Sequence, residues 1–253
     1  MSYKAIISDW NGTLINYPSD ELLHKKIAYA IANDLKSQLF KGEFWKIVDV
    51  MKLVRTKGKL KKRLREFNSG ERHLQDVYDI FNDEILKGKP VKYITGIIDG
   101  FAKEFAKKLD SRVLRPIQAV HKEGVSTGIL SASFGYSIDR ILKEAGYSRI
   151  FDDIVSNDFL VNEGKVLGIT LDIYEKKAEL LHSEFFDKRG LRENNTLYLG
   201  DTKDDEPIAK LLAPGNFIVP FFAPDEFKEK MASKYKAFVP ETEQDLLRYL
   251  QDR

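Results

Sequence analysis

Short apolar runs alternate with helical segments through the second half of this chain, and this alternation restricts the fold more than any other feature. Runs typical of strands begin near Val125, Phe151, Asn195 and Phe217, and each is followed by residues with helical periodicity. Strands that alternate with helices form βαβ units, which build a parallel sheet covered by helices on both faces. The sequence therefore predicts an α/β fold with a Rossmann-like parallel sheet.

Proline and glycine mark the expected ends of several elements. We expect Pro116 at the first position of a helix that ends at Gly124, because proline fits the first helical turn and glycine fits the position after the last. The other expected elements are a strand at 125–130, helices at 137–144 and 174–186, a strand at 151–155, a hairpin at 161–167, and a tail of helix, short strand and helix after Pro224.

The N-terminal stretch Ile6–Leu14 allows two interpretations. The Asn11-Gly12 pair between apolar residues is typical of a hairpin turn, but the same stretch also fits a buried strand that ends in polar residues. Three expected strands end in such residues, and the carboxyl ends of parallel strands meet at one edge of a sheet, where ligands bind. This coincidence favours the strand. The three polar segments are 9–13, 131–133 and 201–205.

Residues 19–109 have helical periodicity without a strand pattern. We predict an all-helical cap domain at 17–111, inserted into a core formed by 1–16 and 112–253. A capping box of Asn68 and Glu71 is expected before the third helix. The apolar residues expected to form the buried helix faces are Leu23, Ile27, Ile31 and Leu35; Phe44, Ile47 or Val48, Met51 and Val54; Leu74, Val77, Phe81 and Ile85; and Ile94, Ile98, Phe101, Phe105 and Leu109.

The most basic run of the chain, 52–65, lies in this helical module. It has no aromatic residues among its lysines and arginines, and the whole chain is nearly neutral, with 41 basic and 39 acidic residues. These facts disfavour nucleic acid. A solvated helix face is the favoured interpretation, and a cap that attracts an anionic substrate is a further one.

The composition indicates a cytoplasmic protein. There is no cysteine, which excludes disulfides and thiolate chemistry and suits a reducing compartment. We expect no signal peptide, no membrane-spanning segment and no membrane partner. Many lysines and glutamates without cysteine also favour a thermophilic source. The sequence does not determine the oligomeric state, monomer or dimer.

The acidic residues at the predicted sheet edge indicate a metal. If Asp9, Asp201 and Asp205 share one cleft, their charges repel unless a cation joins them. Oxygen ligands without nearby histidine or cysteine are typical of Mg²⁺. A metal, a lysine and a serine hydroxyl can hold a phosphate, and a carboxylate facing that phosphate can attack it. Phosphoryl transfer is the chemistry that we expect.

With these motifs in order, the chain resembles the haloacid dehalogenase superfamily, which consists mostly of phosphatases and phosphotransferases. The motifs are 9–14, Ser131 after Ile129-Leu130, a lysine in 175–181, and 200–205. From Ser131 to Leu212 the layout is similar to the phosphoserine-phosphatase branch, and the helical insertion corresponds to the C1 cap of that superfamily. The resemblance implies an Mg²⁺-dependent phosphatase that acts on a small phosphorylated metabolite.

The resemblance also implies residue roles. Asp9 corresponds to the nucleophile, and Lys177 corresponds to the lysine of the third motif, with Lys176 as the alternative. The implied catalytic residues are Asp9, Asn11 and Lys177, the phosphate-binding residues are Ser131, Ala132, Thr13 and Lys177, and the metal ligands are Asp9, Asn11 through its backbone carbonyl, Asp201 and Asp205.

Asn11 departs from the pattern of the superfamily. Phosphatases of this type carry a second aspartate there, which protonates the leaving oxygen and then deprotonates water, and an amide cannot exchange a proton in this way. We expect metal and phosphate binding to persist while proton transfer suffers. The alternatives are a phosphate-binding or regulatory protein with little turnover, and a variant that attacks carbon, which the acidic fourth motif disfavours.

Overall fold

The computed structural model describes residues 3–17, 19–43, 46–68, 74–170 and 173–253. The chain forms two compact units. The first, here the core unit, consists of Met1–Ser19, Ala102–Asn157 and Asp172–Arg253, and the second, here the helical unit, consists of Asp20–Phe101 and Asp158–Leu171. Among the described helices, none combines the length and the hydropathy that crossing a bilayer requires.

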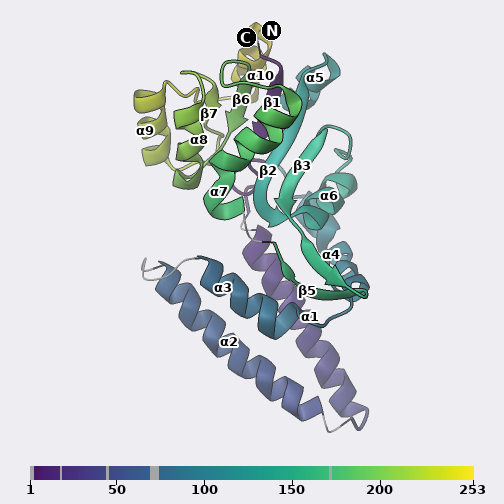
Figure 1. The fold of residues 1–253 in the computed structure, drawn as a ribbon. Coiled ribbons are helices and arrows are strands. Elements are labelled where there is room, and N and C mark those ends of the chain that lie inside the picture. The colour runs from purple at the N-terminus through teal and green to yellow at the C-terminus, as the bar shows by residue number, and fades with distance from the viewer. Residues whose placement is uncertain (1–2, 18, 44–45, 69–73, 171–172) are drawn as a thin grey trace. The chain divides into compact units, whose positions relative to one another are not determined.

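A five-stranded parallel sheet lies at the centre of the core unit (Figure 1). Strand β1 pairs with β2 on one side and with β6 on the other, and the full order is β3-β2-β1-β6-β7. All four residues of β1 are buried, as expected for the middle strand of a sheet covered on both faces. The predicted fold class is confirmed. The strands are β1 Ala5–Ser8, β2 Ser126–Phe134, β3 Asp153–Asn157, β6 Thr196–Leu199 and β7 Phe217–Ile218.

Successive strand residues point to opposite faces of the sheet. Apolar residues therefore occur on both faces, and helices cover them. Ala5 and Ile7 belong to a buried apolar cluster that also contains Phe185, Ile208 and Met231 from the helical segments after β5. The core helices are α5 Ser111–Lys122, α6 Gly135–Glu144, α7 Ile173–Leu180, the π-helix η3 Leu181–Asp187, the 3₁₀ turn η4 Lys203–Asp205, α8 Glu206–Leu211, α9 Asp225–Tyr235 and α10 Glu243–Asp252.

The prediction for Pro116 was wrong. Helix α5 begins at Ser111, and Pro116 lies inside it. The carboxylate of Asp110 accepts a hydrogen bond from the backbone N–H of Arg112 at 2.9 Å, so this acid caps the helix one turn earlier than proline would. The predicted end was right, since Gly124 follows the helix with a φ of 94°.

The described residues of the helical unit form α-helices, a π-helix and a hairpin. Strands β4 Phe159–Asn162 and β5 Lys165–Ile169 pair antiparallel, which confirms the hairpin expected at 161–167. Its turn residues Glu163 and Gly164 both have positive φ, as a tight hairpin requires. The predicted domain boundary at 17–111 stays a prediction. The helices are α1 Ser19–Phe40, α2 Ile47–Asn68, α3 Leu74–Phe81, the π-helix η2 Asn82–Leu86 and α4 Val91–Ala106.

The helix face predicted for α2 was wrong. We expected Ile47 or Val48, Met51 and Val54 to be buried, but all four are more than half exposed. The helix instead turns Thr56 inward, and its hydroxyl donates to the carboxylate of Glu84 at 2.6 Å. Phe44, which was expected on the same helix face, lies outside the described residues. Glu71, which was expected in the capping box, also lies outside them.

Candidate functional site

The polar ends of three adjacent strands form the candidate site. Asp9 follows β1, residues 131–133 form the last part of β2, and Asp201 lies two residues after β6. Because these strands are parallel neighbours, the three segments lie at the same edge of the sheet. Carboxylate oxygens of Asp9, Asp201 and Asp205 all lie within 4.8 Å of one another. The sequence therefore predicted correctly that these three side chains come together.

Asp9 is buried beside a lysine. Its side-chain oxygen Oδ2 lies 3.1 Å from Nζ of Lys177. Burial, with a contribution from the charge of Asp205, raises the pKa of Asp9 to about 7, although Lys177 acts in the opposite direction. A carboxylate with a raised pKa in a polar cluster is typical of functional sites.

The structure distinguishes Lys177 from Lys176. The side chain of Lys177 is buried, and its Nζ donates to Oδ1 of Asp205 at 2.8 Å as well as facing Asp9. Lys176 is exposed, and its backbone (φ −115°, ψ 15°) departs from helical geometry, which kinks α7 at this point. Burial alone would lower the pKa of Lys177, but the two carboxylates outweigh burial and hold that pKa above its usual value.

Both carboxylate oxygens of Asp205 accept hydrogen bonds. Oδ1 accepts from Lys177 and from the hydroxyl of Tyr198, the latter at 2.9 Å. Oδ2 accepts from the backbone N–H groups of Asp201 and Thr202 at 3.2 and 3.3 Å. This carboxylate is fully buried and holds the lysine and the 201–202 backbone in place. The assignment of Asp205 to the metal ligands stays a prediction, and Asp205 lies in the carboxylate group that could hold a metal ion while it also orients its neighbours.

Asp201 packs against the turn after β1. Oδ1 accepts a hydrogen bond from the hydroxyl of Thr13 at 3.0 Å. Gly12 has a φ of 74°, and a Cβ at this residue would lie 1.9 Å from Oδ2 of Asp201, so only glycine fits here. Burial, together with the charges of Asp9 and Asp205, raises the pKa of Asp201 to about 7. Thr13 thus contacts this carboxylate, and its expected role at the phosphate stays a prediction.

Asn11 connects the turn after β1 to two other segments. Its amide nitrogen donates to the hydroxyl of Ser133 at 2.9 Å, and its amide oxygen accepts from the backbone N–H of Ser19 at 3.3 Å and from the Ser19 hydroxyl. Ser131, two residues before Ser133, is buried, and its hydroxyl accepts a hydrogen bond from the backbone N–H of Ser133 at 3.2 Å. The pairing of β2 with β3 shifts register between Ser131 and Phe134, which gives this segment its irregular backbone.

Sequence reasoning missed Tyr198, Ser133 and Ser19. Tyr198 lies within the apolar run of β6, where an inward tyrosine resembles any core residue. Ser133 lies two residues beyond the expected phosphate residue, so the polar segment 131–133 gave a usable indication. Ser19 was assigned only to the start of a helix.

Known proteins identify the family to which this site belongs. A family model described as haloacid dehalogenase-like hydrolase matches residues 6–210, which include all the predicted site residues. The chain belongs to the haloacid dehalogenase-like hydrolase family. The sequence-based prediction of a hydrolase of this type is therefore confirmed.

Individual members of this hydrolase family are more distant. A phosphoserine phosphatase from Streptococcus thermophilus (strain ATCC BAA-250 / LMG 18311) is 32% identical over 103 residues, which is 39% of this chain and 45% of that protein. The chain thus matches less than half of the length of this curated relative.

Several solved structures share the fold of the present chain at low sequence identity. A substrate-bound phosphoserine phosphatase complex has a TM-score of 0.59 at 17% identity and covers 98% of this chain and 99% of its own. Cytosolic 5'-nucleotidase IIIB bound to cytidine has a TM-score of 0.62 at 17% identity, with coverage of 98% and 86%. At these identities the likeness shows the fold alone.

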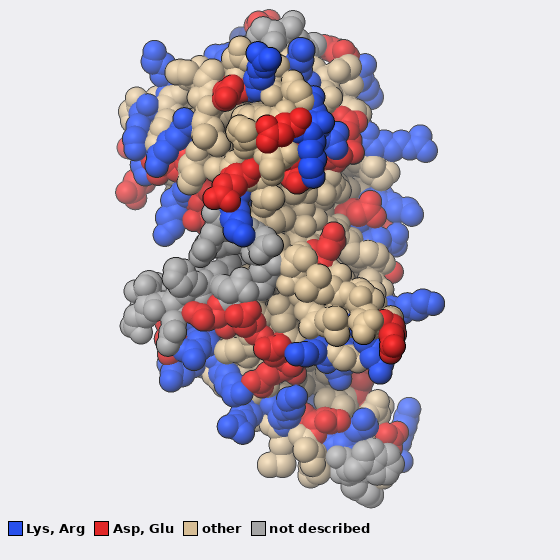
Figure 2. All heavy atoms as spheres, in the orientation of Figure 1, with Lys and Arg blue, Asp and Glu red and all other residues tan. Residues whose placement is uncertain are grey.

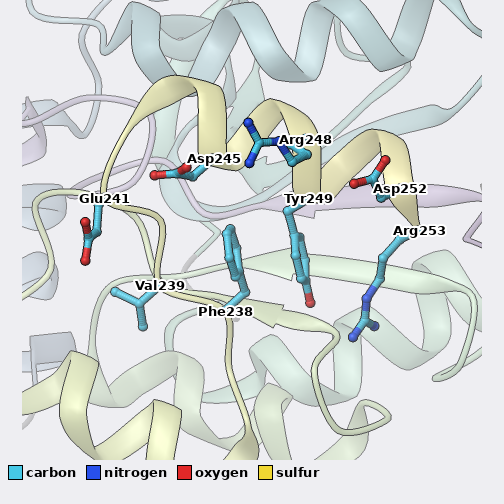
Figure 3. Close-up of a pocket in the computed structure, with 8 residues that line it drawn as sticks. All are labelled: Phe238, Val239, Glu241, Asp245, Arg248, Tyr249, Asp252 and Arg253. Atoms are coloured by element: carbon cyan, nitrogen blue, oxygen red, sulfur yellow. The ribbon is translucent and has the colours of Figure 1, made fainter.

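A hollow of about 580 Å³ lies elsewhere in the core unit, beside α10 (Figure 3). The rings of Phe238 and Tyr249 stack there, with centroids 3.8 Å apart. Arg253 donates to the side chain of Asn216 at 2.7 Å and lies over Tyr249, so it is already held by the fold. Three acidic side chains share the rim, and this mixture does not suit a phosphate. The Asp9 cluster therefore remains the candidate site.

The Asp9 cluster fits a divalent cation by its donor chemistry. Three carboxylates and one ammonium leave a net charge of −2 (three negative, one positive) when all are ionised. The raised pKa values of Asp9 and Asp201 reflect this uncompensated charge in a buried place. A hard cation with oxygen ligands would compensate it. This arrangement can hold a metal and a phosphate side by side.

Proposed function

We propose that this protein is an Mg²⁺-dependent phosphatase that hydrolyses a small phosphomonoester through an aspartyl-phosphate on Asp9. The observation that carries the proposal is the position of Asp9 at the tip of the central strand, 3.1 Å from Lys177 and within 4.8 Å of Asp201. Membership of a hydrolase family and the phosphoserine phosphatase among its relatives support the reaction class.

The residues divide into three roles. Asp9, Asp201 and the backbone carbonyl of Asn11 would hold Mg²⁺, which when bound neutralises charge on the phosphate oxygens. Lys177, the hydroxyl of Ser131 and the backbone of Ala132 would hold the phosphate. We assign Asp205 and Thr13 to positioning, because their polar atoms already bind Lys177 and Asp201.

The proposed reaction has two displacement steps. In the first, a carboxylate oxygen of Asp9 attacks phosphorus, the bond between phosphorus and the leaving oxygen breaks, and the leaving oxygen takes a proton from solvent water. In the second, a water oxygen attacks phosphorus, the bond between phosphorus and the Asp9 oxygen breaks, inorganic phosphate leaves, and the attacking water gives its proton to solvent. Lys177 offsets the negative charge in both steps, because it stays protonated at neutral pH.

In the proposed reaction, Asn11 impairs the proton transfers to the leaving oxygen and from water. Its amide neither gains nor loses a proton near neutral pH, and it is held at both ends by Ser133 and Ser19. Alkyl leaving groups need a proton, whereas aryl and acyl leaving groups need little help. We therefore expect aryl and acyl phosphates to be turned over far faster than alkyl phosphates.

The substitution Asn11→Asp tests this account. It should raise alkyl-phosphate turnover by about 10² to 10⁴-fold, the usual contribution of general acid-base catalysis, and change aryl-phosphate turnover much less. Ser133 can rotate its hydroxyl to donate to the new carboxylate, so the variant should fold. Unchanged alkyl-phosphate turnover would show that another group supplies the proton.

Asp9→Asn tests the proposal as a whole. Turnover of p-nitrophenyl phosphate and acetyl phosphate should require Mg²⁺, disappear with a chelator, and fall by about 10⁴-fold or more in Asp9→Asn. The neighbouring Lys176→Ala serves as a control and should retain activity, because that side chain is exposed.

The second candidate is a phosphate-binding or regulatory protein with little turnover, which the tightly held Asn11 favours. Binding of inorganic phosphate with Mg²⁺, without turnover of any phosphate ester, would support it. The substrate within the class of small phosphorylated metabolites, a cytoplasmic location and a thermophilic source stay predictions from sequence.

A further inference from the structure

Helix α2 presents a stripe of aliphatic side chains to solvent. Ile47, Met51 and Val54 are 55%, 67% and 67% exposed, and their spacing of four and three residues aligns them on one face. Val48 beside them is 67% exposed, and Phe40 at the end of α1 is 93% exposed. Single exposed apolar residues are common, but a continuous stripe is typical of an interaction surface.

The opposite side of α2 is already packed. Thr56 is fully buried, and its hydroxyl donates to Glu84 of the π-helix η2 and to the carbonyl of Lys52. Leu53 and Leu60 turn to the same side and are partly buried. Rotating α2 to bury the aliphatic stripe would break this packing, so the stripe remains available to a partner.

Basic side chains border the stripe on both sides. The helical repeat places Lys57 and Lys61 on one flank and Arg55 and Lys62 on the other. No acidic residue occurs from 50 to 65. Within the described part of the chain, Arg55, Lys57 and Lys61 have no carboxylate partner within 4.0 Å. Figure 2 shows these basic side chains gathered over α2, with uncharged atoms among them towards the α1–α2 end.

We propose that this face of α2 docks on an anionic lipid surface. Helices that lie in a membrane interface combine an apolar stripe with lysine and arginine borders, as α2 does. Each basic residue near an anionic surface contributes about fivefold to binding. This role needs no membrane-spanning segment and is independent of the phosphatase proposal, but it departs from the sequence-based expectation of no membrane partner.

Other partners fit the same observations less well. A second copy of this face would bring the flanking basic residues Arg55, Lys57, Lys61 and Lys62 of both copies together, and like charges repel. Nucleic acid offers phosphates to the lysines but nothing to the aliphatic stripe, and the run lacks aromatic residues for stacking. A single partner helix covers a narrow strip, whereas a flat anionic surface reaches the basic residues on both flanks.

Sedimentation with lipid vesicles tests the proposal on the full chain. The protein should sediment with vesicles of equal parts phosphatidylcholine and phosphatidylglycerol, not with phosphatidylcholine alone, and rising salt should weaken the binding. Arg55→Glu with Lys57→Glu should weaken it by more than about 20-fold, and Met51→Gln with Val54→Gln by at least about tenfold.

Matched control variants separate this surface from general charge and hydropathy. Lys4→Glu with Lys107→Glu makes the same charge change elsewhere, and Leu211→Gln removes another exposed apolar side chain. Both should bind vesicles like the unmodified protein. Every substituted residue is exposed, so circular dichroism and aryl-phosphate turnover should be unchanged in all variants.

Four outcomes would overturn the proposal. They are no sedimentation with anionic vesicles, equal binding to neutral vesicles, α2 variants that bind as well as the controls, and a dimer in analytical ultracentrifugation that Met51→Gln with Val54→Gln dissociates. The last outcome would assign the stripe to a second copy of the chain.

Discussion

The core unit and the helical unit each contain a cluster of like charges, and the two clusters differ in burial. The core unit buries three carboxylates within 4.8 Å of one another, and donors at fixed distances hold them. The helical unit spreads eight basic residues over α2, where most are exposed. Buried charges need specific partners because little water screens them, whereas exposed charges are screened and contribute little singly. Single substitutions should therefore matter greatly in the first cluster and little in the second.

The largest effect is expected at Asp205. Asp205→Ala removes the acceptor of Lys177, Tyr198 and two backbone N–H groups in a fully buried place. The free energy of unfolding should fall by about 3–5 kcal/mol, as when one partner of a buried ion pair is removed. Denaturant unfolding measures this change. Arg55→Ala on α2 is the comparison and should change it by less than about 0.5 kcal/mol. Equal losses in both variants would contradict the contrast drawn between the clusters.

A smaller loss is expected at Gly12. Gly12→Ala places a Cβ 1.9 Å from Oδ2 of Asp201 and also strains a backbone with a φ of 74°. The expected cost is about 1–3 kcal/mol of unfolding free energy, with weaker Mg²⁺ binding because Asp201 must move.

Gly146→Ala separates the two causes at Gly12. Gly146 has a φ of 79°, but a Cβ there would contact nothing within 4 Å. Gly146→Ala should lower the free energy of unfolding through backbone strain alone and leave Mg²⁺ binding unchanged. If both variants bind Mg²⁺ equally well, the close approach of Gly12 to Asp201 does not matter for the metal.

The pH dependence of metal binding sharpens the contrast further. Asp9 and Asp201 have a pKa of about 7 in the fold, above the ordinary value of 3.8. Between these values the folded state binds more protons than the unfolded state, so the stability that these groups contribute falls as pH rises towards 7. Mg²⁺ favours the ionised carboxylates, so its stabilising effect on Tm should grow from pH 5 to pH 8.

Asp201→Asn is the control for this pH effect. It removes one of the repelling charges, so the metal-free protein at pH 8 should become more stable by roughly 1 kcal/mol, about the size of a single pKa unit. The same variant should lose the response of Tm to Mg²⁺. A full Mg²⁺ response in Asp201→Asn would remove this residue from the metal site.

The smallest effect on stability is expected at the aliphatic stripe of α2. Met51→Gln with Val54→Gln should change the free energy of unfolding by less than about 0.5 kcal/mol, because both side chains are 67% exposed. The buried Ile94 of α4 provides the contrast, and Ile94→Ala should cost about 2–5 kcal/mol. Thermal unfolding of the three proteins measures this directly. A large loss in the α2 variant would mean that the stripe is packed.

The outcome at particular residues shows where sequence reasoning holds and where it fails. The strand ends at Asp9, Ser131 and Asp201 were predictable, because apolar runs that stop at polar residues depend on local pattern alone. Pro116 misled the prediction, since Asp110 provides a helix cap that outweighs the preference of proline for the first turn. The stripe of α2 was assigned to the inside because hydropathy does not reveal which face a neighbouring helix covers.

The sequence by itself determined the order of the elements, the parallel sheet and the identity of the residues at its polar edge, because these follow from local periodicity and chain connectivity. Only the tertiary structure decided between Lys176 and Lys177, gave Asp205 its contacts with Lys177 and Tyr198, and left the aliphatic stripe of α2 in solvent. Each of these depends on distances between segments far apart in the chain, and local pattern carries no information about such distances.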